Sequence, residues 1–407
     1  MAVVEPWGRG GMIHYAFQLA RGLSFAGAEV SLVTSRGYEL DGLDPPFEVV
    51  RLLRLWDPKP SGRVSTTTAA RAFRKLRRVA RAARYHREWL RLARWLEREQ
   101  PDVVQLGDLR FAADAPWIGR LARKGFPLCD VCHNVRPFAL GGPSAGTFRR
   151  SRIEHLLYRR AYRRFERVFV HYETNRRSFL RAFDVADERV VTIPHGNESL
   201  FAELRDPGSS PDRIRDDLGL DRGDRVVLLF GTLSPYKGVD VLLRAFPEVS
   251  RVEPDAVLAI AGYPLTGFDL GAARQLARKH GVADRVVFVP RYVDSREVAA
   301  WMELAEVAVF PYRSVWQSGA VAVAQTFGTP IVASRVGALE EELAGGEAGL
   351  LVPPGDPDAL AAAIARVLAD DDLADRLGAR ASEIAETRRD WSEIGARMLR
   401  EYREVLR

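Results

Sequence analysis

A lysine at the start of the second half of the chain carries the sharpest chemical signal. The run Phe230-Gly-Thr-Leu-Ser-Pro-Tyr-Lys-Gly238 follows an apolar strand pattern, and a helical pattern begins at Val239. This spacing would point the Lys237 ammonium and several backbone N–H groups at one ligand. Preorganised positive charge of this kind stabilises a leaving diphosphate. The run does not match G-x-x-x-x-G-K-[ST], which excludes a P-loop.

Composition makes this lysine more informative. The 407 residues include 60 basic and 54 acidic side chains, and only five of the basic ones are lysines, at positions 59, 75, 124, 237 and 279. A bias toward arginine can follow genome composition, so the net charge of +6 is weak evidence for a charged partner. A lysine inside a structured motif of such a chain indicates a specific role.

A glycine-rich turn follows the first predicted strand. Gly8, Gly10 and Gly11 open the first predicted helix, where backbone N–H groups offer a site for phosphate. The spacing is not G-x-G-x-x-G, and no acidic residue ends the second strand (Ser31-Leu-Val-Thr-Ser35), which argues against a dinucleotide cofactor. A plain tight turn is the alternative to a phosphate loop.

One of three histidines with notable positions is a candidate for the site. His133 ends a strand that faces the predicted cleft, and a site role is favoured there. His14 lies one turn into the first helix, where packing is equally plausible. His195, between Pro194 and Gly196, is expected to shape the approach to a linker.

The two cysteines are best interpreted as buried strand thiols. Cys129-Asp-Val-Cys132 is formally C-x-x-C, but it falls within a strand and has no second pair, so a zinc or redox role is disfavoured. Two cysteines in this length also rule out a disulfide-stapled secreted scaffold.

The elements that must position these residues alternate along the chain. Strands are expected at residues 2–4, 29–34, 47–53, 102–106, 128–133, 167–171 and 190–193, and then at 226–230, 256–261, 286–289, 307–310 and 330–333. Helical patterns lie between most of them, for example at 12–25, 239–249, 272–280 and 359–368. This alternation predicts the α/β class, with parallel doubly wound sheets. So many strands favour two sheets over one.

The seam between the sheets should lie where strand patterns lapse. Residues 197–223 are rich in Pro, Gly, Ser and Asp, which is typical of a linker with at most one short helix. We therefore expect two Rossmann-like domains facing a central cleft, at residues 1–197 and 198–388. Residues 389–407 form a helical pattern that can pack back on the first domain.

Two arginine-rich segments, 71–98 and 149–167, have helical apolar spacing. The plain interpretation is a pair of surface helices with a core-facing stripe, which includes Phe73, Leu76 and Leu156, and a solvated basic face. The functional alternative is attraction to anionic lipid headgroups or to an acidic acceptor. No nucleic-acid-binding motif accompanies them. Without a leader or a spanning run of apolar residues, a cytoplasmic location is expected, with a peripheral position on the membrane as an option.

The motifs taken together resemble the family-four retaining glycosyltransferases of GT-B architecture. That family carries Gly-Arg-Leu-x-x-x-Lys-Gly where this chain has its lysine loop. The resemblance extends through the glycine-rich first loop, His133-Asn134, Ile193-Pro-His-Gly-Asn197 and Phe310-Pro-Tyr312 to Gly328-Thr-Pro-Ile-Val-Ala-Ser334, and then to Val336-Gly-Ala-Leu-Glu-Glu341 and Gly349-Leu-Leu-Val-Pro-Pro-Gly355. It therefore covers nearly the whole chain.

The resemblance implies retaining, metal-independent transfer without a cofactor, in which the leaving diphosphate helps to deprotonate the acceptor. It implies that Lys237 and His133 act on the reacting groups, with Lys237 on the diphosphate and His133 near the transferred sugar. Residues expected to contact the nucleotide-sugar donor are Gly10, Gly11, Gly231, Thr232, Ser234, Lys237, Arg291, Tyr292, Gln317, Ser318, Gly319 and Glu341.

Two departures from the family pattern concern the donor. The family's arginine, five residues before the lysine, is Thr232 here. The family's glutamate pair falls on Val315 and Val323, and residues 310–337 contain no Asp or Glu. Since the second glutamate normally holds the donor ribose, the nucleotide is left open. Gln317 and Ser318 are neutral candidates for these contacts, although Ser318 could simply be a helix N-cap.

The sequence thus favours a glycosyltransferase that moves a sugar from a nucleotide donor to a hydroxyl of a glycan, lipid-linked or small-molecule acceptor. Two alternatives stay open: a GT-B-like protein that binds sugar nucleotides without catalysis, and a sugar-nucleotide epimerase of the same architecture. A nucleic-acid-binding protein is the weakest candidate.

Overall fold

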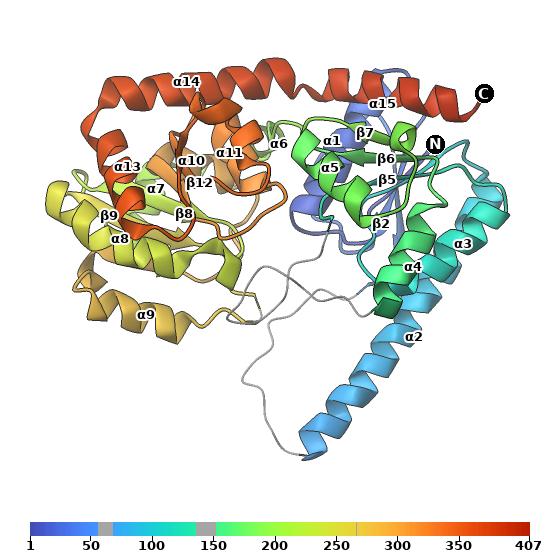
Figure 1. Cartoon of the computed structure of the whole chain (residues 1–407), viewed down its shortest axis with the longest axis horizontal. Coiled ribbons are helices and arrows are strands. Elements are labelled where there is room, and N and C mark those ends of the chain that lie inside the picture. The colour runs from blue at the N-terminus through green and yellow to red at the C-terminus, as the bar shows by residue number, and fades with distance from the viewer. Residues whose placement is uncertain (56–67, 136–151, 266) are drawn as a thin grey trace.

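The chain folds into two parallel β-sheets, and helices cover both faces of each (Figure 1). This computed structural model describes residues 1–55, 68–135, 152–265 and 267–407, and for residues 68–79 it describes the backbone only. The two α/β halves are the architecture that the alternation of strand and helix patterns predicted.

The first sheet has seven strands in the order β3-β2-β1-β4-β5-β6-β7, and all neighbouring strands are parallel. The bounds are β1 Ala2–Val4, β2 Ser31–Ser35, β3 Glu48–Leu53, β4 Val104–Leu106, β5 Leu128–Val131, β6 Arg167–Val170 and β7 Val190–Thr192. The order reverses between β1 and β4. Ligands of doubly wound sheets bind outside the carboxyl ends of the strands at such a switch point.

The second sheet has six parallel strands in the order β10-β9-β8-β11-β12-β13. The bounds are β8 Arg225–Phe230, β9 Ala256–Ala261, β10 Val286–Val289, β11 Ala305–Phe310, β12 Ile331–Ser334 and β13 Leu350–Val352. Here the order reverses between β8 and β11, and the lysine loop follows β8.

The helices that connect these strands are mostly two to five turns long. Those of the first half are α1 Gly11–Phe25, α2 Thr68–Glu99, α3 Ala115–Arg123, α4 Arg152–Tyr162 and α5 Glu173–Ala182. Those that follow are α6 Leu200–Glu203, α7 Pro211–Leu218, α8 Val239–Val252, α9 Leu270–Lys279, α10 Val298–Leu304, α11 Gly319–Thr326, α12 Leu339–Glu342, α13 Pro357–Ala369, α14 Asp371–Arg388 and α15 Trp391–Val405.

Each sheet separates two hydrophobic cores because alternate side chains of a strand point to opposite faces. In β1, Val3 packs in one core while Ala2 and Val4 pack in the other. In β9, Leu258 and Ala259 divide in the same way. Strands buried on both faces explain the continuous apolar runs from which the sequence predicted them.

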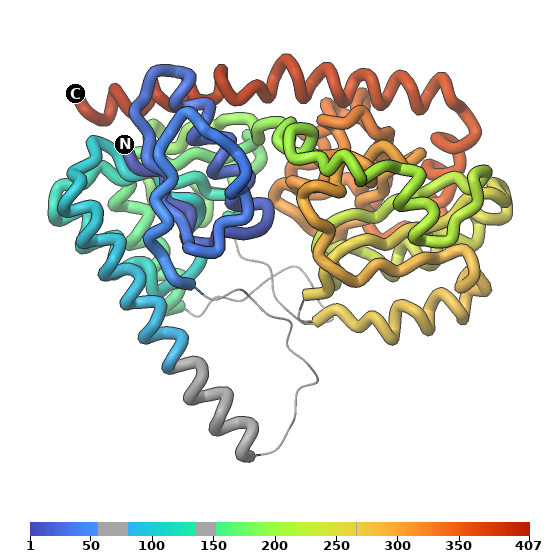
Figure 2. The backbone as a smooth tube through the Cα atoms, turned by 180° about the vertical axis from the view of Figure 1, so that it is seen from behind, coloured from blue at the N-terminus to red at the C-terminus, as the bar shows by residue number. Residues whose placement is uncertain are grey.

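The last two helices run along one side of both halves, as two opposite views show (Figures 1 and 2). Helix α14 covers the second half, and α15 packs on α1 and β6 of the first. The α1–α15 contact is close because a Cβ on Gly22 would lie 2.1 Å from the Trp391 carbonyl oxygen. Between the two helices, the buried Arg389 donates to Gln325 Oε1 at 2.5 Å and to the Glu342 carbonyl at 2.9 Å.

The structure differs from the sequence expectation in three places. Strand β13 was not predicted; its three residues pair only with β12 at the sheet edge. The linker contains two helices, α6 and α7, where at most one was expected. Leu156, predicted to face the core, is 45% exposed on α4.

Other expectations can be located directly. Cys129 and Cys132 are buried and form no disulfide, as predicted. The side chains of Phe73 and Leu76 lie outside the described part of the chain. Among the described residues, no helix combines the length and the apolar character that crossing a bilayer requires.

Candidate active site

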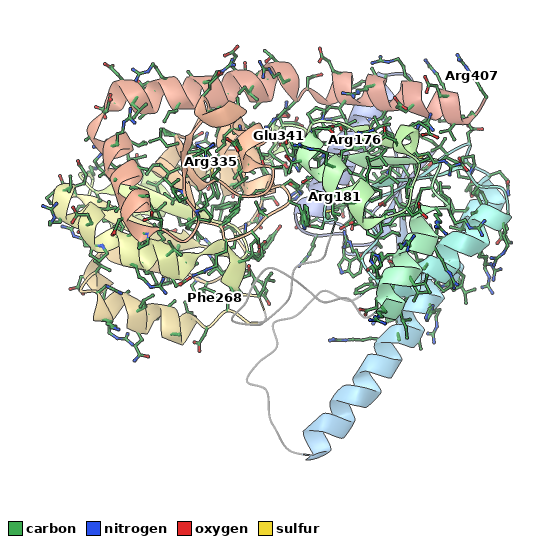
Figure 3. The ribbon with its side chains drawn as sticks, in the orientation of Figure 1. Arg176, Arg181, Phe268, Arg335, Glu341 and Arg407 are labelled. Carbon is green, nitrogen blue, oxygen red and sulfur yellow. The ribbon has the colours of Figure 1, made fainter. Side chains whose placement is uncertain are left out.

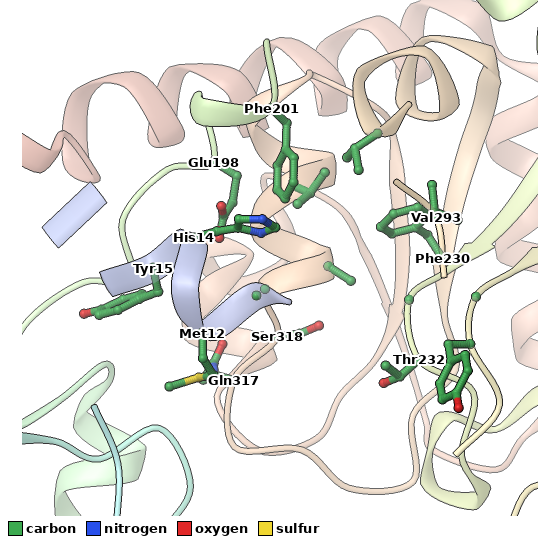
Figure 4. A pocket seen from close by; sticks show the side chains of 18 of the residues that line it. Met12, His14, Tyr15, Glu198, Phe201, Phe230, Thr232, Val293, Gln317 and Ser318 are labelled. Atoms are coloured by element: carbon green, nitrogen blue, oxygen red, sulfur yellow. The ribbon is translucent and has the colours of Figure 1, made fainter. Parts of the chain in front are cut away.

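A cavity of about 400 Å³ lies between the two halves, within the ~300–1,000 Å³ range of ligand sites. Met12, His14, Tyr15 and Glu198 approach it from one side, and Phe230, Thr232 and Val293 from the other (Figure 4). The sequence-predicted residues that line it are Gly11, His133, Gly231, Thr232, Lys237, Tyr292, Gln317, Ser318 and Gly319.

Lys237 is held at the cavity wall by its own loop. The run after β8 forms a short turn, Pro235–Lys237, and Gly238 is the N-cap of α8, with φ of 70°. A Cβ on Gly238 would lie 1.9 Å from the Pro311 carbonyl oxygen, so this left-handed position excludes any side chain. Gly238 thereby lets the lysine loop approach the end of β11. This approach brings Lys237 next to the aromatic residues that follow β11.

The Lys237 ammonium has aromatic neighbours and no carboxylate partner among the described residues. Its Nζ donates to the Tyr312 hydroxyl at 2.6 Å and lies 4.0 Å from the Tyr312 ring centroid. Burial lowers the pKa of Lys237 from 10.5 to about 7. A buried ammonium without a counterion is poised to gain from an anionic ligand.

Arg313, a nearby arginine, does not take the place of the family's arginine, which is Thr232 in this chain. Arg313 donates to the Pro235 carbonyl at 3.1 Å and to both carboxylate oxygens of Asp240 at 2.6–2.7 Å. It therefore braces the lysine loop from outside the cavity. Among the described lining residues, Lys237 is the only lysine or arginine.

The glycine-rich turn lies at the opposite wall, where Gly10 is the N-cap of α1 with φ of 87°. Its N–H donates to Glu39 Oε1 at 2.7 Å, and His14 Nε2 lies 2.8 Å from the same oxygen. His14 Nε2 also lies 3.1 Å from Ser295 Oγ, and the Tyr292 hydroxyl donates to Glu39 at 3.3 Å. This network joins the two halves across the cavity.

Ser318 has the role of helix N-cap that was considered for it. Its Oγ accepts from the backbone N–H of Val321 at 3.4 Å and lies 3.3 Å from the Tyr312 hydroxyl. Lys237, Tyr312 and Ser318 thus form one polar chain at the start of α11. Val323, at the position of the family's second glutamate, lines the cavity one turn further along.

His133, two residues after β5, lines the cavity and is buried. Its Nδ1 lies 3.0 Å from His171 Nε2, and the Tyr15 ring meets its ring edge-on at 4.5 Å between centroids. Burial lowers the pKa of His133, so the imidazole is neutral near pH 7. A neutral imidazole can accept or donate a hydrogen bond to a sugar hydroxyl.

Four predicted donor residues lie outside the cavity lining: Gly10, Ser234, Arg291 and Glu341. Arg291 is half-exposed and paired with Glu297 at 2.6 Å. Ser234 is a buried residue of the lysine loop itself. Glu341 accepts from the backbone N–H groups of Glu173 and Thr174 at 2.9 Å, so it contacts the N-terminus of α5 in the first half (Figure 3).

The structure adds a carboxylate that the motifs did not suggest. Glu198 lines the cavity and is buried, and its only described side-chain partner is Gln18 Nε2 at 3.2 Å. Its backbone N–H donates to Thr326 Oγ1 on α11, which places this linker residue beside the helix that carries Val323. Burial raises the pKa of Glu198 to about 8. The sequence signal that could have indicated Glu198 is its position, because it is an acidic residue directly after the run Pro-His-Gly-Asn.

Two facing doubly wound halves with a cavity at the carboxyl ends of their strands define the GT-B class of structures. Sucrose-phosphate synthase from Thermosynechococcus elongatus has a similar fold, with a TM-score of 0.71 and 22% identity over 99% of this chain and 98% of that one. Anabaena Alr3699/HepE in complex with UDP aligns with a TM-score of 0.68 and 18% identity over 99% of both chains.

Two family models match nearly adjoining parts of the sequence. Residues 10–196 match the glycosyl transferase 4-like domain, and residues 224–370 match the glycosyl transferases group 1. The chain belongs to the family-four glycosyltransferases, as its motifs predicted.

A curated relative shares part of this sequence. D-inositol 3-phosphate glycosyltransferase 2 of Catenulispora acidiphila is 36% identical over 240 residues, which are 57% of this chain and 54% of the relative. The chain therefore spans little more than half the length of this relative.

Proposed function

We propose that this protein transfers a sugar, with retention of configuration, from a nucleotide donor to a hydroxyl group of an acceptor. The observation that carries the proposal is Lys237, a buried ammonium that has no carboxylate partner in the described part of the chain. It lies at the wall of an interdomain cavity, opposite a glycine-rich helix start. Such a group stabilises the charge that develops on a leaving diphosphate. Family membership supports the same reaction class.

The donor lies in the cavity with its diphosphate at Lys237, in this proposal. The helix start after Gly11 offers further N–H donors, and His133 contacts the transferred sugar. Gln317, two residues before α11, and Gly319, at its start, contact the donor, and Tyr292 contacts the base. Catalysis comes from positioning and from the Lys237 charge, and the transfer step itself uses no metal.

Closure of two domains, residues 1–197 and 198–388, accompanies donor binding in this proposal. The cavity is lined from both halves, so a ligand within it contacts both. Closure would exclude water from the reacting groups and bring the acceptor side against the donor side. Helix α15 then stays with the first domain, on which it packs.

The central test is the Lys237→Ala variant, for which we expect a loss of roughly 10²–10³-fold in transfer rate. The matched control is Lys279→Ala on the exposed end of α9, which should leave the rate unchanged. Donor identity would be screened first, with UDP, GDP and other nucleotide sugars tested for thermal stabilisation. Near-normal transfer by Lys237→Ala would refute the proposed function.

A non-catalytic donor-binding protein is the second candidate. It is favoured by the presence of only one lysine or arginine among the described residues of the cavity lining. Thr232 and Val323, at positions where the family pattern has charged residues, favour it as well. Calorimetric binding of a nucleotide sugar without transfer across a broad acceptor panel would support it. Turnover of donor without any acceptor would instead indicate an epimerase.

We also propose that the basic face of α2 attracts an anionic membrane surface that carries the acceptor. Arg81, Arg84 and Arg87 are exposed, while Trp89 and Leu92, further along the same helix, are buried. Replacing the three arginines by alanine should abolish binding to phosphatidylglycerol vesicles. Binding to phosphatidylcholine vesicles should not change. The matched control replaces three exposed arginines of the second half, Arg278, Arg366 and Arg388. Absence of binding by the parent protein would end this proposal.

A further inference from the structure

Three histidines from separate parts of the sequence meet at one edge of the first sheet. His133 lies two residues after β5, His171 directly follows β6, and His195 lies three residues after β7. Because β5, β6 and β7 are neighbouring parallel strands, their carboxyl ends lie side by side. All three side chains are at least 96% buried.

The ring nitrogens of this cluster lie at nearly the separation that metal ligands need. His133 Nδ1 and His171 Nε2 are 3.0 Å apart, and one nitrogen of each of the three rings lies within 4.8 Å of the others. Two ligands on a tetrahedral ion with bonds of roughly 2.0–2.1 Å are about 3.3 Å apart. The first pair meets this requirement, and His195 needs to approach by roughly 1–1.5 Å.

The surroundings favour the ligating form of these imidazoles. His195 Nδ1 lies 3.0 Å from the Gly196 carbonyl oxygen, which accepts a proton held there and leaves Nε2 as the lone-pair nitrogen. Metal ligation requires neutral imidazoles, and the burial of all three rings disfavours their charged forms.

We propose that His133, His171 and His195 bind one divalent transition-metal ion, with Zn²⁺ as the expected occupant. Imidazole nitrogens suit ions of this class. His133 and His195 also line the cavity, so water can supply a fourth ligand from that side.

The proposed ion has no step in the sugar transfer, and the site does not depend on the proposed function. By holding Nδ1 of His133, the ion would fix which edge of this imidazole faces the cavity. Without metal, the His133–His171 hydrogen bond alone fixes that edge.

The test uses the full chain after chelator treatment and needs no sugar substrate. Zn²⁺ is titrated by calorimetry and Co²⁺ by visible absorption. We expect one ion per chain, the intense visible bands of four-coordinate Co²⁺, and at least about tenfold weaker binding in His171→Ala and His195→Ala. The matched control is His280→Ala at the end of α9, away from the cluster, which should bind as the parent does.

A variant-free measurement keeps the proposal testable if these substitutions impair folding. In the parent protein labelled with ¹⁵N-histidine, Zn²⁺ should shift the signals of three of the seven imidazoles. No stoichiometric binding by the parent would overturn the proposal. So would unchanged affinity in folded His171→Ala and His195→Ala, or an equal loss of affinity in His280→Ala.

Discussion

Lys237 combines two properties that oppose each other in the empty protein. Its position suits an anionic ligand, but burial lowers its pKa to about 7, so part of the population is neutral at physiological pH. A bound diphosphate restores the charged form because it supplies the missing counterion. The lysine is therefore a site of proton uptake on ligand binding.

This coupling predicts the pH dependence of UDP binding, if UDP is the nucleotide that binds. Above pH 7, binding must bring a proton to Lys237, so affinity should fall by up to about tenfold per pH unit between pH 7 and 9. Calorimetry at pH 8 in buffers of different ionisation enthalpy should report uptake of nearly one proton. Lys237→Met should show none, and equal uptake by that variant would contradict the assignment.

Glu198 predicts a second pH effect, on the stability of the fold. The folded chain holds its proton up to about pH 8, whereas the unfolded chain loses it near the ordinary value of 4.5. The folded state therefore binds more protons between these values, and stability falls as pH rises through them. The contribution is about 1.4 kcal/mol per unit of pKa difference.

Replacing Glu198 by Gln should remove this loss of stability. Relative to the parent protein, Glu198→Gln should gain stability as pH rises from 5 to 8.5, as measured by denaturant unfolding. Glu203→Gln, on the exposed end of α6, is the control and should change little with pH. A constant difference between Glu198→Gln and the parent at both pH values would show that Glu198 titrates normally.

At the scale of the element, the lysine loop depends on a glycine for two separate reasons. Gly238 has a left-handed φ, and it also approaches the Pro311 carbonyl too closely for any Cβ. Gly219, at the end of α7, has a similar φ of 67° but open space around it. A substitution at Gly219 therefore measures the cost of the left-handed backbone alone. A substitution at Gly238 measures that cost together with the steric overlap.

We therefore expect Gly219→Ala to cost only about 1 kcal/mol, from the left-handed backbone alone. Gly238→Ala should cost at least about 2–3 kcal/mol, because the loop must also move away from β11. Denaturant unfolding measures both values. Equal costs would indicate that the Pro311 contact relaxes freely.

At the scale of the whole molecule, one of two neighbouring acidic residues makes a contact between the halves. Glu341 accepts two backbone N–H bonds at the start of α5, where the helix dipole favours an anion. Glu340, the preceding residue, pairs with the half-exposed Arg335 within its own half. Only the first contact joins the two halves.

Glu341→Ala should lower the free energy of unfolding by about 1–2 kcal/mol. Glu340→Ala should change it by less than about 0.5 kcal/mol, as is usual for a surface ion pair. If the two substitutions have the same effect, Glu341 does not contribute a specific contact between the halves.

The sequence by itself determined most features that depend on neighbours along the chain. Buried strands give apolar runs, and Lys237-Gly238 must follow a strand and precede a helix, so these were predicted. Strand β13 was missed because three residues carry little periodicity, and Leu156 was misplaced because helical spacing alone does not say which apolar positions find a partner.

Only the tertiary structure decided which distant residues share a cavity. A hydrogen bond from the linker to α11 holds Glu198 at the cavity. Glu341 lies outside the cavity lining and contacts the start of α5. His171 joins His133 and His195 because β6 lies between β5 and β7 in the sheet. These outcomes follow from the order of the strands and from the packing of one half on the other. The spacing of residues along the chain indicates neither the strand order nor this packing.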